Sequence, residues 1–184
     1  GITWQLGGSY EDQMDTFIDM GMLLVLMVIL VFVIMASQFE SLSFPFVIMF
    51  SLPFAVVGVM LGLWISNTAL GVMGLLGVLM LVGIVVNNGI VLVDYTRLLI
   101  GRKLPIIDAV VAGGRSRLRP ILMTTLTTVL GMVPMAVGNG VGSEMWNSLG
   151  MVVAWGLSFS TLVTLFLIPV LFTWLALRQE RKQA

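Results

Sequence analysis

Two adjacent amides stand out among the side chains that could do chemistry in this very apolar sequence. Asn87 and Asn88 lie near the end of the segment 41–93, which contains no charged residue. In apolar surroundings an amide needs a hydrogen-bond partner on another helix. Polar groups of this kind either join helices or line a path for ions. The two amides by themselves are compatible with both roles.

One carboxylate is placed where it could act together with the amides. Asp94 follows Asn87 by seven residues, two turns of a helix, so both lie close to the same helical face. A carboxylate inside a membrane can take up and release protons. Asp94 is also close to Tyr95 and Arg97 at the end of the apolar run, where a hydrated charge serves as an anchor. Both roles remain open for Asp94.

A second polar face is formed by small residues further along the chain. Thr124, Thr128 and Gly131 are spaced by four and three residues, which places them on one side of a helix. We expect this face to pack against the Gly83–Asn87 face, with threonine hydroxyls meeting the amides. As simple helix packing, this contact needs no further function.

The composition argues against an enzyme or a metal site. The sequence contains no Cys and no His, which removes disulfides, thiolate sites and the commonest metal ligand. Without His, the Ser and Thr side chains cannot form the usual triad. The formal net charge is zero, and the sequence has no basic cluster of the kind that binds nucleic acid. We therefore expect no catalysis, no metal, no bound cofactor and no nucleic-acid partner.

Hydropathy predicts an all-α membrane protein. Of the 184 residues, 59% are hydrophobic and 10% are charged, whereas soluble domains contain about 25% charged residues. A span needs about 20 apolar residues, so the charge-free runs predict a five-helix transmembrane bundle in a lipid bilayer. The predicted helices are at about 21–37, 44–65, 71–96, 120–137 and 146–177. In the second helix, Pro53 predicts a kink, and Gly58 and Gly62 predict close packing against another helix.

The N-terminal segment 1–19 precedes these spans. Residues 1–6 are typical of a short strand, and residues 10–20, with four acids, are typical of a wet or interfacial lead-in helix. A strand with no partner in the same chain suggests a piece cut from a larger protein.

Basic residues predict the orientation of the bundle. All nine Lys and Arg residues lie in the polar loop 97–119 or in the tail 178–184. Five spans bring both regions to one face, which the positive-inside rule makes cytoplasmic. Within the loop, residues 105–112 predict a short amphipathic helix that Gly113 and Gly114 end.

Four motifs in this order and spacing resemble a known family. They are FESLSFP at 39–45, GIVVNNGIVLVD at 83–94, RLRPILMTT at 117–125 and GMVP at 131–134. Together they resemble the last five transmembrane helices of the resistance-nodulation-division (RND) exporters, most closely the hydrophobe/amphiphile efflux branch. The resemblance covers essentially the whole chain, and residues 1–6 would match the final strand of a periplasmic porter region.

The resemblance implies one half of a twelve-helix, proton-driven efflux permease. Such a pump is a homotrimer in the bacterial cytoplasmic (inner) membrane, works with a periplasmic adaptor and an outer-membrane channel, and needs no cofactor besides the proton gradient. The chain would then act with the N-terminal half of the same permease, and its C-terminus would be cytoplasmic. The alternatives are a structural membrane bundle that transports nothing, and a lipid- or protein-export relative of the same superfamily.

The resemblance also implies roles for single residues. In the family, two aspartates of the other half take up protons beside a polar residue that is often Lys, and Asn87 stands at that position here. This departure removes the salt bridge that a Lys would form. Thr124 matches a threonine of the relay. Asn88 is next to Asn87, and Asp94 lies further along the same helix as Asn87. Proton relay by these residues is what the resemblance implies.

Overall fold

The computed structural model describes residues 9–138, 140 and 142–183, and the strand expected at residues 1–6 lies outside this part of the chain. In chain order the helices are α1 (Ser9–Phe39), α2 (Ser43–Met49), α3 (Leu52–Ser66), α4 (Val72–Gly101), α5 (Ile106–Val137) and α6 (Ser143–Gln183). The segments long and apolar enough to cross a membrane are Glu11–Phe39, Ser43–Ser66, Val72–Gly101, Ile106–Val137 and Met145–Arg178. The predicted all-α bundle of five spans is therefore confirmed.

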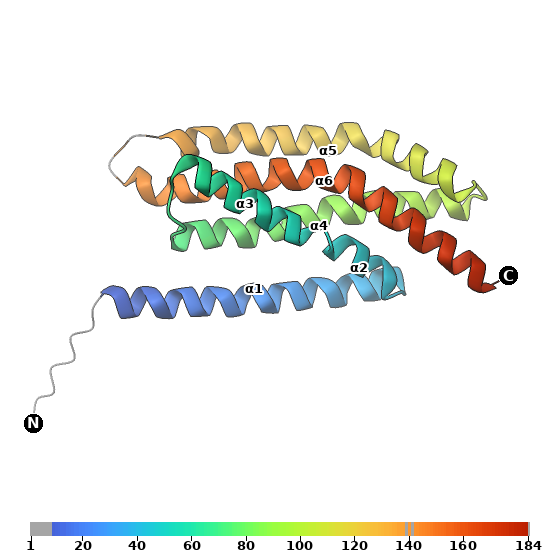
Figure 1. Cartoon of the computed structure of the whole chain (residues 1–184), viewed down its shortest axis with the longest axis horizontal. Coiled ribbons are helices and arrows are strands. Elements are labelled where there is room, and N and C mark those ends of the chain that lie inside the picture. Colours follow the sequence, from blue (N-terminus) through green and yellow to red (C-terminus); the bar gives the residue numbers. More distant parts are fainter. Residues whose placement is uncertain (1–8, 139, 141, 184) are drawn as a thin grey trace, which may run out of the picture.

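Helix α6 is the element around which the bundle packs. It contacts α3, α4 and α5 along much of its length, and Figure 1 shows these four helices gathered together. The α4 and α6 helices run parallel, as two contacts in the same order along both helices show: Gly77 packs on Val152, and Gly89 packs on Ile168. The α5 helix runs antiparallel to them. Thr125 of α5 lies against Thr161 of α6, so the middles of these two spans lie at a similar depth.

Glycines allow α3 to approach α6 closely. A methyl group added at Gly58 would lie 2.6 Å from the Cβ of Phe159, and one at Gly62 would collide with Trp155. Because the glycines have no side chain, Trp155 and Phe159 can lie directly against the α3 backbone. The buried residues Ala55, Val59 and Leu63 of α3 extend the same contact into the core.

Helix α1 lies at the edge of the bundle (Figure 1) and is anchored at its C-terminal end. None of its most apolar stretch is buried inside the structure. At its end, the Arg97 Nη1 of α4 donates a hydrogen bond of 3.0 Å to the Phe39 carbonyl. The same guanidinium lies 5.5 Å from the Phe39 ring centroid and 4.9 Å from that of Phe44. We call these three residues the Arg97 anchor.

The predicted break at Gly113 and Gly114 is wrong. Helix α5 runs without interruption from Ile106 to Val137, so the polar loop 97–119 is largely helical. A methyl group at Gly113 would lie 2.6 Å from the Thr96 Oγ1 of α4. Gly113 therefore allows two helices to pack closely, and it does not end one of them.

The second span is interrupted, and the first is longer than its apolar core. The helix expected at 44–65 consists of α2 and α3, which separate at Phe50 and Ser51, and Pro53 lies in the first turn of α3. The Ser51 hydroxyl donates to the Ile48 carbonyl over 2.7 Å and closes the bend. The acidic segment 10–20, in contrast, is continuous with the first span as part of α1.

Candidate functional site

Asn87 lies at the midpoint of the α4 span and points away from the core. Its side chain is exposed, whereas that of Asn88 is 9% exposed. In the described part of the chain, the side-chain hydrogen bonds donated from α4 are those of Thr96 and Arg97, and neither amide takes part in one. The two adjacent amides thus face different sides of α4. Asn88 faces the packed side, and Asn87 faces an open side.

Asp94 lies on the open side of α4 together with Asn87. Its carboxylate is exposed, two turns nearer the end where the basic residues lie. The next side chain, Tyr95, supports the Arg117 guanidinium of α5 at 4.6 Å from its ring centroid. Met80, seven residues before Asn87, is also exposed. These residues form an open stripe on α4 with one amide and one carboxylate.

The threonine face of α5 is open as well, and it does not meet Gly83. The Thr124 hydroxyl donates within its own helix, 3.0 Å from the Ile121 carbonyl, and the Thr128 hydroxyl donates to the Thr124 carbonyl over 2.8 Å. Gly131 has nothing within 4 Å of the position of a Cβ, and Gly83 packs on Met27 of α1 instead. The expected pairing of the threonine face with Gly83 is therefore wrong.

Buried hydroxyls lie along the middle of α6, one of them paired with α5, and the sequence pattern had not been interpreted as such a polar face. Thr125 and Thr161 share a hydrogen bond of 3.1 Å and are 7% and 4% exposed. Ser160 and Thr164, on the same part of α6, have buried oxygens with no hydrogen-bond partner. The spacing of Ser160, Thr161 and Thr164 within a charge-free run is the signal that could have indicated this polar face.

Arg117 is the second group that the sequence reading did not use. Its Nε is buried and has no hydrogen-bond partner, and its guanidinium stacks on Tyr95. Stacking on an aromatic ring holds a cation at a defined position. A fixed positive charge therefore lies in the first half of α5, where this helix packs against Tyr95 of α4.

The open faces of α4 and α5 can form hydrogen bonds but cannot carry a proton at their centre. Asn87 lies at the midpoint of one span and Thr124 close to the midpoint of the next. Amides and hydroxyls do not titrate near neutral pH. In the described part of the chain, no group of three or more His, Cys, Asp or Glu could hold a metal. These faces are suited to a titratable partner on another helix.

Comparison with known proteins identifies relatives of the chain. The model of the AcrB/AcrD/AcrF family matches residues 1–176. The chain is 37% identical over 182 residues to the swarming motility protein SwrC of Bacillus subtilis (strain 168), covering 98% of this chain and 17% of SwrC. It is 33% identical over 173 residues to the multidrug export protein AcrF of Escherichia coli (strain K12), covering 94% of this chain and 16% of AcrF.

Metal exporters are similarly close. The cobalt-zinc-cadmium resistance protein CzcA of Cupriavidus metallidurans is 34% identical over 171 residues, which cover 93% of this chain and 16% of CzcA. A crystal structure of a heavy metal efflux pump superimposes with a TM-score of 0.80 at 29% identity, covering 94% of this chain and 18% of that one. The chain thus spans about a sixth of the length of these relatives.

Proposed function

This chain belongs to the AcrB/AcrD/AcrF family of RND permeases, and on that basis we propose that it supplies part of the membrane domain of a proton-driven efflux permease. Its share would be five spanning helices and one wall of the proton relay. In this proposal Asn87, Asn88 and Thr124 belong to the relay, and Asp94 lies at its exit. The chain itself is neither an enzyme nor dependent on a cofactor other than the proton gradient.

The observation that carries this proposal is the exposed amide at the centre of α4. Asn87 lies at mid-span on an open helix face, and Thr124 is exposed near the centre of the adjacent α5. Hydrocarbon would leave such an amide without a hydrogen bond, at a cost of a few kcal/mol. A partner helix that carries titratable carboxylates would satisfy the amide and supply the group that binds the proton.

The partners and the location follow from the same proposal. The open faces of α4 and α5 would pack against the other half of the same permease, which forms a homotrimer in the bacterial inner membrane. A periplasmic adaptor and an outer-membrane channel would complete the export path. The C-terminus and the loop 97–119 would lie in the cytoplasm, where the excess of Lys and Arg favours them.

The exported substrate is proposed only as a class. The names of the relatives include multidrug export and cobalt, zinc and cadmium resistance at nearly equal identity. We place the chain in the hydrophobe/amphiphile branch, because its motifs resemble that branch most closely. The family's substrate-binding regions are periplasmic, and the helices described here carry no metal-ligand cluster.

Reconstitution in liposomes with a trapped pH dye tests the proposal. The 184-residue chain alone should move no protons with any substrate, because its mid-span groups do not titrate. The same chain co-expressed with the other half should show substrate-dependent proton movement. Proton movement by the chain alone would overturn the division of roles, and no movement in the complete permease would overturn the transport function itself.

A further inference from the structure

An apolar groove lies between the beginning of α5 and the end of α6. It has a volume of about 440 Å³ and is lined mainly by aliphatic side chains and one tryptophan. Its lining residues are Ile107, Val110 and Val111 of α5 and Pro169, Val170, Thr173, Trp174 and Leu177 of α6. This volume is in the range of pockets that hold drug-sized ligands. Ile107, Val111 and Val170 are more than half exposed, so the groove is open to its surroundings.

The groove spans the boundary between the acyl chains and the lipid headgroups. The centre of the α6 span Met145–Arg178 is close to Thr161. Val170 is 9 residues further along, about 14 Å from the centre at the helical rise, and Trp174 is about 20 Å away. The hydrocarbon core ends about 15 Å from the centre. Val170 therefore meets the outer part of the acyl chains, and Trp174 lies in the headgroup layer, where Trp is enriched.

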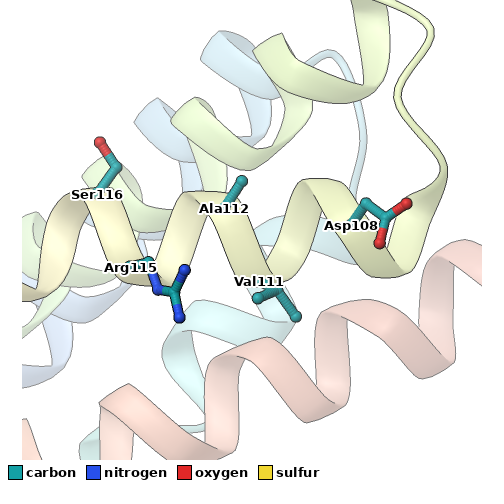
Figure 2. A pocket seen from close by; sticks show the side chains of 5 residues that line it. All are labelled: Asp108, Val111, Ala112, Arg115 and Ser116. Carbon is teal, nitrogen blue, oxygen red and sulfur yellow. The ribbon is translucent and has the colours of Figure 1, made fainter.

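Positive charge lies at both ends of the groove. On α6, the Arg178 guanidinium stacks 3.8 Å from the Trp174 ring centroid. On α5, Arg115 is one turn beyond Val111, and these two residues also line an adjoining hollow. Figure 2 shows Val111 and Arg115 projecting from the same side of α5, the side on which the pale red ribbon of α6 lies in that view. Two guanidinium groups can therefore reach the headgroup layer beside the groove.

The nearest carboxylate of α5 does not line this groove. Asp108 belongs to the adjoining hollow, and in Figure 2 it projects toward the connection from α4. Arg115 lines the same adjoining hollow as Asp108, and with Arg178 on α6 the net charge beside the groove is positive. Basic pockets between spanning helices attract anionic lipid headgroups. A zwitterionic lipid would meet the same apolar wall without this gain.

We propose that the groove between α5 and α6 binds one anionic phospholipid of the surrounding bilayer. Its acyl chain would lie along Val111 and Val170, and its phosphate would lie between Arg115 and Arg178, beside Trp174. The proposal does not depend on transport, because it uses only the helix ends and the bilayer. It assigns a lipid site to a surface that is distinct from the open stripe with Asn87.

Lipid-specific quenching in bilayers tests this site. The chain contains no Cys, so Val170→Cys can carry a single bimane label, and Leu162→Cys, exposed at mid-span on the same helix, provides the reference. Each sample receives trace brominated phosphatidylglycerol or trace brominated phosphatidylcholine in the same host bilayer. The ratio of the two quenching efficiencies reports local enrichment of the anionic lipid and cancels the depth of the label.

The expected ratio exceeds one at Val170 and equals one at Leu162. Each arginine near anionic lipid contributes up to roughly a five-fold preference, so Arg115→Gln together with Arg178→Gln should bring the ratio at Val170 back to one. Arg102→Gln, which changes an exposed arginine outside the groove, should leave it unchanged. A ratio of one in the unmodified background would overturn the proposal, and so would a high ratio that survives the double arginine change.

Discussion

At the scale of single residues, the open side of α4 combines an exposed amide at mid-span with an exposed carboxylate two turns away. Asn87 can donate and accept hydrogen bonds without changing its charge. It can therefore sense the protonation of a neighbouring carboxylate but cannot replace it. Asn88 lies on the packed side of the same helix and is 9% exposed. The two adjacent amides are thus expected to differ when they are replaced.

We expect Asn87→Leu in the complete permease to leave insertion intact and to reduce export. A lost hydrogen bond to a charged group costs about 1.5–3 kcal/mol, which corresponds to a decrease of roughly ten- to hundred-fold. Thr124→Val should show a milder loss. Thr127→Val, the same change at another exposed position of α5, is the matched control. Export by Asn87→Leu at the normal rate and normal expression would make Asn87 a packing residue only.

The buried pair of Thr125 and Thr161 provides a prediction on stability. Thr125→Val removes a buried hydrogen bond of 3.1 Å, and the remaining hydroxyl keeps its desolvation cost. Thermal unfolding in detergent should show a loss of about 1 kcal/mol for either single change. In the double change Thr125→Val with Thr161→Val, the loss should be smaller than the sum, by an interaction energy of about 0.6 kcal/mol. Strict additivity would show that the hydrogen bond contributes nothing.

At the scale of elements, α1 is held mainly at one end. Along its apolar stretch it is not buried, and Met27 contacts α4 at Gly83. At its C-terminal end it has no basic residue of its own in the last turn, and Arg97 from α4 supplies the missing cation to the Phe39 carbonyl. A cation at a helix C-terminus is favourable. The Phe44 ring, stacked on Phe172 of α6 at 5.3 Å, connects this anchor to the bundle.

We expect Arg97→Gln to release α1 without unfolding the other helices. The change removes one charged hydrogen bond and two cation–π contacts, together about 2 kcal/mol. Nitroxide labels at Leu23→Cys on α1 and Met80→Cys on α4 would report the change as a broader distance distribution. Arg102→Gln should leave the distribution as it is. An unchanged distribution in Arg97→Gln would mean that the anchor does not hold the helix.

At the scale of the whole molecule, the number of spans and the positions of the two basic regions must be consistent with one orientation in the membrane. The structure brings the end of α1, the start of α5 and the end of α6 to one end of the bundle, the right-hand end in Figure 1. The segments 97–119 and 178–183, which contain all Lys and Arg residues, therefore lie at that end. By the positive-inside rule, the end of a bundle that carries the Lys and Arg residues is expected on the cytoplasmic side.

Thiol labelling of whole cells checks this orientation. Single cysteines at Ser9 and Gly140 should react with an impermeant reagent added from outside. Cysteines at Ser116 and Gln183 should react only after the membrane is opened, because they lie at the basic end. External labelling of Ser116→Cys would contradict the positive-inside orientation.

The sequence by itself determined the class, the number of spans and the family. Charge-free runs can be seen directly in the sequence. In a membrane such a run must form a helix, because every backbone polar group must be hydrogen-bonded within its own segment. The four motifs indicated the family for a similar reason, because their order and spacing are visible in the sequence before the chain is folded. Even so, the bounds of α5 were not visible, because a glycine pair ends a helix in one context and allows close packing in another.

Only the tertiary structure decided which polar side chains meet. Neighbouring residues of a helix point about 100° apart, so the rotation of α4 determines that Asn88 faces the core and Asn87 does not. The same applies to α5, where Thr125 pairs with Thr161 while Thr124 stays open. Helix rotation depends on the volumes packed between helices, such as Trp155 against Gly62. These contacts join residues far apart in the chain, so they cannot be predicted from the hydropathy of a single segment.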